Sequence, residues 1–225
     1  MNQQEGKSPD MFNISDGSPQ VIDLAQEHIE TFIGEIDVVL HETVSDHLHV
    51  DVHVIPATED RPFLTLVTTG MSDLPMNVPE ELDEYKYAEL LICLPPDWPL
   101  SMEAFQDEKN YWPVRWLKTL ARYPYNADTW LGMNHTIPLG DPPEPVCEGS
   151  QMIGFMLVPP IFFDEEFGEL KVSDEKTVHF YQLLPLHADE MDLKVEEGAD
   201  ALWEKFENNV PIGDLLDPNR KSACA

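Results

Sequence analysis

Apolar and polar residues alternate along the first quarter of the chain in patterns that predict a helix and then a β-hairpin. Apolar residues recur at helical spacing between positions 21 and 33, and Gly34 is a suitable end for that helix. Residues 36–44 are rich in β-branched side chains, residues 45–46 are able to turn, and residues 47–55 alternate strictly. This order predicts two antiparallel strands joined by a short turn.

The strand predicted at residues 47–55 has two chemically different faces, because successive side chains point to opposite sides of a strand. The apolar face carries Leu48, Val50, Val52 and Val54. The polar face carries His47, His49, Asp51 and His53. Residues 63–69 predict a third strand, which Gly70 ends.

The remaining apolar stretches predict three more strands and two more helices. The strands lie at residues 87–94, 152–158 and 178–184, and the helices lie at residues 114–123 and 189–208. Residues 87–94 show no polar face, which is typical of a central strand covered on both sides. Pro113 suits the first turn of the earlier helix and Pro124 ends it. Because strands and helices do not alternate regularly, the sequence predicts an α+β fold with a mixed, largely antiparallel β-sheet flanked by helices.

The distribution of polar residues predicts a single compact domain with loose ends. Residues 1–20 are expected to form a flexible N-terminal arm, and residues 21–210 the folded domain. Residues 211–225 are expected to form a short polar tail that frays.

Acidic residues dominate the composition: 43 Asp and Glu face 13 Lys and Arg, for a formal net charge of −30. Such a surface repels nucleic acids and anionic membranes, so neither is expected as a partner. It attracts basic proteins, and a basic partner should associate rapidly at low salt. The alternative is that the acidic surface only confers solubility. The oligomeric state is left open.

Motifs for catalysis and export are missing from the sequence. The chain contains no GxSxG, Walker A, GxGxxG or HExxH motif, so we predict neither enzyme activity nor a cofactor. Its three cysteines, Cys93, Cys147 and Cys224, form no CxxC pair, and Cys93 within an apolar run is expected to be a buried free thiol, so a disulfide-stapled secreted domain is not expected. The sequence shows neither a signal peptide nor an apolar run of membrane-spanning length, so the cytoplasm is the expected location.

Two kinds of surface residue are candidates for contact with a partner protein. Arg115, Lys118 and Arg122 are spaced i, i+3 and i+7, so they share one face of the predicted helix. The alternative is that this face pairs with the chain's own carboxylates. Aromatic and acidic residues complete the candidates: Trp98, Trp112, Asp164, Glu165 and Glu166.

The histidine-rich strand face supports a different function, metal binding with or without enzyme activity. Imidazole and carboxylate groups are good ligands for zinc, nickel or iron. Same-face neighbours lie about 6.5–7 Å apart along a strand, so His47, His49, Asp51 and His53 cannot all bind one ion without help from another strand. His41 on the partner strand is a source of that help. The alternative is a polar face whose histidines form hydrogen bonds across the hairpin.

Several short motifs, taken in order, resemble the Suppressor of fused family. Residues 66–73 resemble its "T-x-G-x-S-D" signature, and residues 87–92 its "E-L" strand. Trp112-Pro113 and residues 117–123 resemble its "W-P…L-x-x-L-A-R-Y" helix. The segments at residues 134–138 and 178–186 and the helix from Asp189 follow in the same order. The resemblance covers about residues 30–208 and is closest to a stand-alone bacterial member without the second domain of animal proteins.

This resemblance implies a non-catalytic protein-binding role for the domain at residues 21–210. Animal members sequester a zinc-finger transcription factor in the cytoplasm, and bacterial members are thought to include immunity proteins, which act as antitoxins against polymorphic toxins. The signature residues Thr69, Gly70, Ser72 and Asp73 have a structural interpretation. Gly70 is able to adopt a positive φ, and Ser72 or Asp73 is able to bind the turning backbone.

Overall fold

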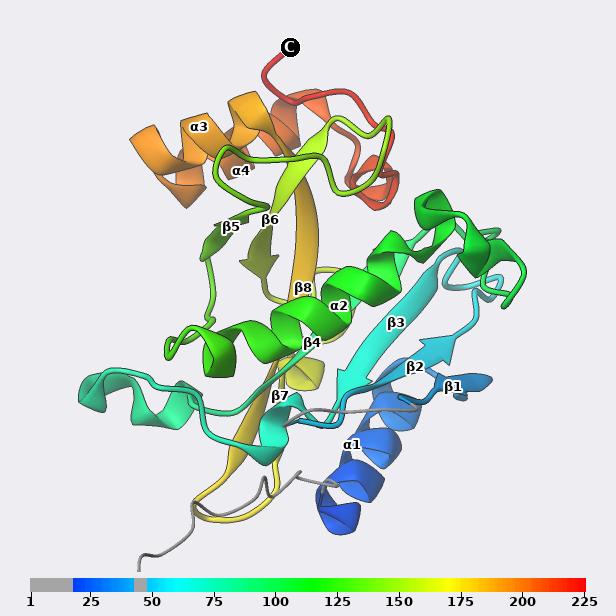
Figure 1. Ribbon diagram of the computed structural model, residues 1–225, viewed down its shortest axis with the longest axis vertical. Helices are drawn as coiled ribbons and strands as arrows, with labels where there is room; N and C mark the ends of the chain where they lie inside the picture. Colours follow the sequence, from blue (N-terminus) through cyan, green and yellow to red (C-terminus); the bar gives the residue numbers. More distant parts are fainter. Residues whose placement is uncertain (1–17, 43–47) are drawn as a thin grey trace, which may run out of the picture.

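The computed structural model describes residues 18–42 and 48–225, which form one mixed β-sheet with helices on both faces (Figure 1). The strands are β1 (Val38–Leu40), β2 (Asp51–Ile55), β3 (Leu64–Thr69), β4 (Ala88–Leu94), β5 (Thr136–Pro138), β6 (Met152–Val158), β7 (Glu169–Lys171) and β8 (Thr177–His187). The helices are α1 (Pro19–Phe32), α2 (Glu108–Asn126), α3 (Ala188–Glu197) and α4 (Ala199–Asn209), with short 3₁₀ turns η1 (Met71–Asp73), η2 (Glu80–Tyr85), η3 (Ala104–Gln106), η4 (Glu165–Gly168) and η5 (Ile212–Leu216).

The strand order is β1-β2-β3-β4-β8-β6-β5, with β7 paired to β8. Only the β4–β8 pair is parallel among the strands that the structure describes. The predicted fold class, a mixed and largely antiparallel sheet flanked by helices in one compact α+β domain, is therefore confirmed.

The long central strand β8 separates two apolar layers. Tyr181 and Leu183 point into the layer that packs under α2. Phe180 on the opposite face belongs to the layer beneath α1, and Leu184 belongs to the layer beneath α3 and α4. Helix α2 therefore covers one face of the sheet, and α1 and the α3–α4 pair cover the other (Figure 1).

The first hairpin differs from its prediction in extent. Strand β1 is short, and the ladder between β1 and β2 begins with Leu40 opposite Val52. The predicted turn at residues 45–46, and His47 with it, lie outside the described residues. The predicted alternation in the second strand is confirmed from Leu48 onward, because its even-numbered residues face α2.

Two predicted helix boundaries are wrong. Helix α2 runs from Glu108 to Asn126 and contains both Pro113 and Pro124, which were expected to bound it. Its true start is capped by Asp107, whose carboxylate accepts a hydrogen bond from the Lys109 N–H at 3.0 Å.

The helix expected at residues 189–208 is two helices, α3 and α4. They meet at Gly198, where the backbone takes a φ of 99° that interrupts a helix.

The tail from Pro211 is packed rather than frayed, so that expectation is wrong. Arg220 and Ala223 are buried, and the Arg220 guanidinium binds the buried Glu190 carboxylate at the start of α3. An ion pair removed from water at this position requires the tail to stay in place.

Within the described part of the chain, every helix is too short or too polar to cross a lipid bilayer.

Candidate functional site

The signature turn after β3 is organised by one buried carboxylate, Glu89 of β4. Its Oε1 accepts the backbone N–H groups of Gly70 at 3.0 Å and Ser72 at 2.9 Å. Its Oε2 accepts the hydroxyl of Thr68 at 2.6 Å. Glu89 thus takes up backbone donors that a turn leaves unpaired, which explains a charged residue inside an apolar strand. The prediction that residues 87–94 have no polar face is wrong at this residue.

The Glu89 carboxyl is buried, and both of its oxygens accept hydrogen bonds. Burial raises the pKa of the Glu89 carboxyl, while hydrogen bonds from Thr68 and Ser72 lower it in part. Two further residues hold the carbonyls of the same turn. Lys176 Nζ donates to the Ser72 carbonyl at 2.7 Å, and the Tyr125 hydroxyl donates to the Met71 carbonyl at 2.6 Å.

Gly70 and Ser72 bind Glu89 through their backbone N–H groups, and the other two signature residues make contacts of their own. Thr69 Oγ1 lies 2.8 Å from His53 Nε2, and the Asp73 carboxylate accepts the Ser18 N–H at 3.2 Å. Gly70 has a φ of 104°, and a Cβ there would lie 2.0 Å from the His49 carbonyl oxygen. This geometry favours the structural interpretation of the motif.

The basic face of α2 is engaged by the chain itself. Arg122 forms an ion pair with Glu42 and also donates to the Leu48 carbonyl at 2.9 Å. Lys118 Nζ donates to the Leu40 carbonyl at 3.1 Å. Both residues therefore fasten α2 to the edge of the sheet.

Arg115 behaves in the same way at the other end of this face. It pairs with Glu108, donates to the Val146 carbonyl at 2.8 Å and lies over the Trp116 ring. The structure thus favours the alternative of internal pairing for the predicted basic face.

The two candidate tryptophans differ in their access to solvent. Trp112 is 1% exposed and stacks within the core against Phe155, so its prediction as a partner contact is wrong. Trp98 is half-buried, donates its indole N–H to the Asn110 carbonyl at 2.9 Å and packs on Trp112. Trp98 therefore extends the apolar core beside α2.

The predicted acidic patch Asp164, Glu165 and Glu166 is exposed at the start of the 3₁₀ turn η4. The buried Phe167 anchors this turn beneath α1, where its ring stacks on His28. The patch therefore remains a candidate contact surface.

The polar face of β2 brings together part of the predicted metal set. Asp51 Oδ2 lies 2.8 Å from His41 Nδ1, and Asp51 Oδ1 lies 3.0 Å from His49 Nε2. His53 is instead buried beside Thr69, and burial lowers its pKa to about 4. His47, the remaining member of the predicted set, lies outside the described residues.

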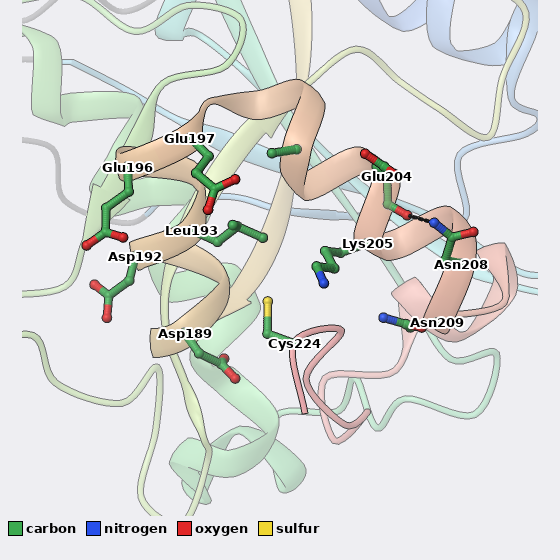
Figure 2. Close-up of a pocket in the computed structure, with 11 residues that line it drawn as sticks. Asp189, Asp192, Leu193, Glu196, Glu197, Glu204, Lys205, Asn208, Asn209 and Cys224 are labelled. Atoms are coloured by element: carbon green, nitrogen blue, oxygen red, sulfur yellow. Dashed lines mark hydrogen bonds between the residues drawn. The ribbon is translucent and has the colours of Figure 1, made fainter.

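A second acidic surface, which the sequence interpretation missed, is an open groove of about 750 Å³ between α3, α4 and the C-terminal segment (Figure 2). Its acidic lining residues are Asp189, Asp192, Glu196, Glu197 and Glu204. Lys205 and Cys224 point into the groove from the other sides. The signal was the spacing of Asp189, Asp192 and Glu196 at i, i+3 and i+7, which places three carboxylates on one helix face.

The groove is built by the break at Gly198 and by the packed tail. The buried Glu190–Arg220 pair fastens the tail to the start of α3. Ser222 Oγ donates to the Asp189 carboxylate at 2.8 Å, and Asn209 donates to the Ala223 carbonyl at 2.7 Å. These contacts fix the floor of the groove and leave the carboxylates of the α3 face exposed.

The described residues define an α+β domain with one mixed sheet, a buried carboxylate under its signature turn and an acidic groove at one end. The family model described as Suppressor of fused protein (SUFU) matches residues 46–221. Because this match spans most of the chain, the chain belongs to the Suppressor of fused family.

Two relatives show how far the similarity extends across whole chains. An uncharacterized protein of Ureaplasma parvum serovar 3 is 25% identical over 190 residues, covering 84% of this chain and 88% of that protein. A crystal structure of a Suppressor of fused homologue from Neisseria gonorrhoeae superposes with a TM-score of 0.60 at 19% identity. That match covers 91% of this chain and 94% of the Neisseria chain.

Two other crystal structures share the fold. The Sufu–Fu complex superposes with a TM-score of 0.60 at 17% identity, covering 90% of each chain. Drosophila Suppressor of Fused gives a TM-score of 0.59 at 16% identity, and the match covers 90% of this chain but 50% of the Drosophila chain. The match therefore spans about half of the Drosophila chain in that structure.

Proposed function

We propose that this chain is a non-catalytic protein-binding domain that holds a basic partner protein on its acidic surface. In the most specific form of the proposal it is a cytoplasmic bacterial immunity protein that neutralises a basic toxin domain. The acidic groove between α3 and α4, in a chain with a formal net charge of −30, is the observation that carries the proposal. The Sufu–Fu complex supports it, because there a protein of this fold binds another protein.

The groove suits a basic segment for electrostatic reasons. Asp192, Glu196 and Glu197 are all exposed on α3, so their fields add at the groove. Screening in salt of physiological strength acts over about 8 Å, so these charges act together on a cation brought into the groove. Such charges mainly raise the association rate and make binding sensitive to salt.

The test begins with capture of the full chain's partner from its own cells at low salt, followed by release at high salt and identification. The purified partner is then titrated with three proteins in direct binding measurements. They are the wild type, the groove variant Asp192→Asn/Glu196→Gln/Glu197→Gln, and the patch variant Asp164→Asn/Glu165→Gln/Glu166→Gln. The two variants lose the same charge from different surfaces, so each is the matched control of the other.

At low salt we expect the association rate of the groove variant with the partner to fall by about tenfold or more. The patch variant should bind like the wild type. The opposite ranking would move the binding surface to η4. Equal binding by all three proteins would exclude both surfaces. Absence of a stoichiometric partner at either salt concentration would refute the binding role itself. For the immunity form, the partner's own activity must fall when the chain is added in equimolar amount.

A further inference from the structure

Three potential metal ligands converge where β1 ends and β2 begins, far along the sheet from the acidic groove. His41 follows β1, His49 precedes β2, and Asp51 is the first residue of β2. One donor atom from each of these three side chains lies within 4.8 Å of the other two. Within the described residues, this is the one group of three such side chains that includes histidine ligands.

The backbone makes this convergence a local property of the hairpin. His49 and Asp51 are two residues apart, so their side chains lie on the same face of the strand. The ladder pairs Val38 with Val54 and Leu40 with Val52, and continuing it by one residue places His41 opposite Asp51. Directly opposed residues in an antiparallel pair also share a face.

The hydrogen bonds show how an ion would fit among these groups. An ionised carboxylate only accepts, so His41 Nδ1 and His49 Nε2 each direct an N–H at one oxygen of Asp51. In the tautomer that carries the hydrogen on the other ring nitrogen, His41 Nδ1 and His49 Nε2 are both lone-pair donors beside the Asp51 carboxylate.

We propose that His41 Nδ1, His49 Nε2 and the Asp51 carboxylate form a binding site for one divalent transition-metal ion, represented by Zn²⁺. Two imidazoles with one carboxylate suit zinc, iron or nickel, whereas Mg²⁺ and Ca²⁺ prefer sites made of oxygen atoms. Zinc sites with three protein ligands keep a fourth position for water or another ligand.

The carboxylate at the centre of the site is held in place before any ion binds. Asp51 Oδ1 accepts the Glu42 N–H at 3.1 Å, and the Glu42 side chain is fixed by Arg122 of α2. The Asp51 side chain is 12% exposed, whereas the side chains of His41 and His49 are 71% and 29% exposed. The site therefore combines a rigid inner ligand with an open side through which an ion can enter.

An ion bound here would join the end of the edge strand β1 to β2. Three ligands from the two arms of one hairpin would close that hairpin with a coordinate cross-link. A ligand that binds the folded state alone also raises thermal stability. We therefore expect one equivalent of Zn²⁺ to raise the unfolding midpoint of the chain.

The test uses the untagged full chain, with Zn²⁺ titrated by calorimetry in excess Mg²⁺ and Co²⁺ followed by its visible absorption spectrum. Excess Mg²⁺ occupies the oxygen-only sites of an acidic surface, and the Co²⁺ spectrum reports nitrogen ligands and coordination number. The variants are His41→Ala, whose exposed side chain can be removed without disturbing the core, and Asp51→Asn, which keeps the side-chain volume. His135→Ala is the control, because His135 lies against Trp130 outside the site.

We expect one equivalent of Zn²⁺ to bind despite Mg²⁺. His41→Ala and Asp51→Asn should each weaken binding by about tenfold or more, since losing even an outer partner of a metal site costs that much. His135→Ala should bind like the wild type. The proposal is wrong if Zn²⁺ does not bind, if Mg²⁺ displaces it, if both ligand variants bind like the wild type, or if the control variant weakens binding equally.

Discussion

Arg220 and Glu190 form an ion pair that is almost completely removed from water, and its disruption is a sharp test of how the tail is held. The two side chains are 3% and 0% exposed. Arg220 donates to Glu190 Oε1 at 2.5 Å and to Oε2 at 2.7 Å, and it also donates to the Pro185 carbonyl at 3.0 Å. The substitution Arg220→Met keeps much of the volume but leaves the Glu190 carboxylate buried without its counter-charge.

The expected cost follows from that uncompensated charge. Removing one partner of a buried ion pair destabilises a protein by about 3–5 kcal/mol. Total stabilities are about 5–15 kcal/mol, so the loss is a large share of the whole. With an m-value of about 2–3 kcal/mol/M in urea, the unfolding midpoint should fall by roughly 1–2.5 M.

The assay is urea unfolding at pH 7, followed by tryptophan fluorescence. Lys171→Met is the control, because its pair with Asp174 is 70% and 97% exposed and should contribute less than about 1 kcal/mol. Limited proteolysis of residues 211–225 gives a second measurement, which should show faster cleavage in Arg220→Met. If the unfolding free energy of Arg220→Met stays within about 1 kcal/mol of wild type, and its tail is cleaved no faster, the reasoning is refuted.

Three other buried positions have measurable consequences. Gly70→Ala should destabilise the fold by more than Gly198→Ala, since both have positive φ but only at Gly70 would a Cβ meet a backbone oxygen, at 2.0 Å; equal urea midpoints would contradict this. The raised pKa of Glu89 means that the folded state holds its proton more tightly than the unfolded state, so wild-type stability should fall as pH rises above the usual carboxyl pKa. Glu89→Gln should lack that dependence of stability on pH. Parallel stability profiles of the two proteins against pH would contradict the raised pKa of Glu89. Burial raises the pKa of Cys93 to about 12, so a thiol reagent should modify Cys224 in the native protein long before Cys93.

The strands were predictable wherever the residue pattern alone indicated which side chains face the core and are buried. The alternation from Leu48 to Ile55 places valines under α2 and polar residues opposite them, as the structure shows. The apolar runs that became β4, β6 and β8 were recognisable for the same reason. Strand order was beyond reach, because pairing β4 with β8 joins segments separated by more than 80 residues and leaves no local signal.

The errors share a cause, which is that distant contacts override local signals. Pro113 and Pro124 lie inside α2 because its buried stripe packs on the sheet and holds the helix together across them. The polar tail folds because Arg220 finds Glu190, 30 residues earlier in the chain. Glu89 was a clearer signal in the sequence, since a carboxylate within an apolar strand must be paired or hydrogen-bonded to be buried.

The candidate sites were only partly predictable for the same reason. His49 and Asp51 share a face by strand geometry, but the choice of His41 over His53 as the third member depends on how β1 pairs with β2. The groove between α3 and α4 exists only because the helix breaks at Gly198 and the tail returns beneath it. Acidic spacing along α3 was visible in the sequence, whereas the concave shape was not.

The few basic residues explain why substitutions that affect stability should differ from substitutions that affect partner binding. Arg61, Arg122 and Lys176 bind backbone carbonyls or carboxylates of the chain itself, as Arg220 does. In the described part of the chain these cations therefore act as internal fasteners, while carboxylates such as those of the α3 face remain toward water. Substitution of one of these internally bound basic residues should lower the unfolding free energy and leave a basic partner's association rate unchanged. Neutralising the groove carboxylates should lower the association rate without lowering the unfolding free energy, because mutual repulsion among exposed carboxylates does not stabilise the fold.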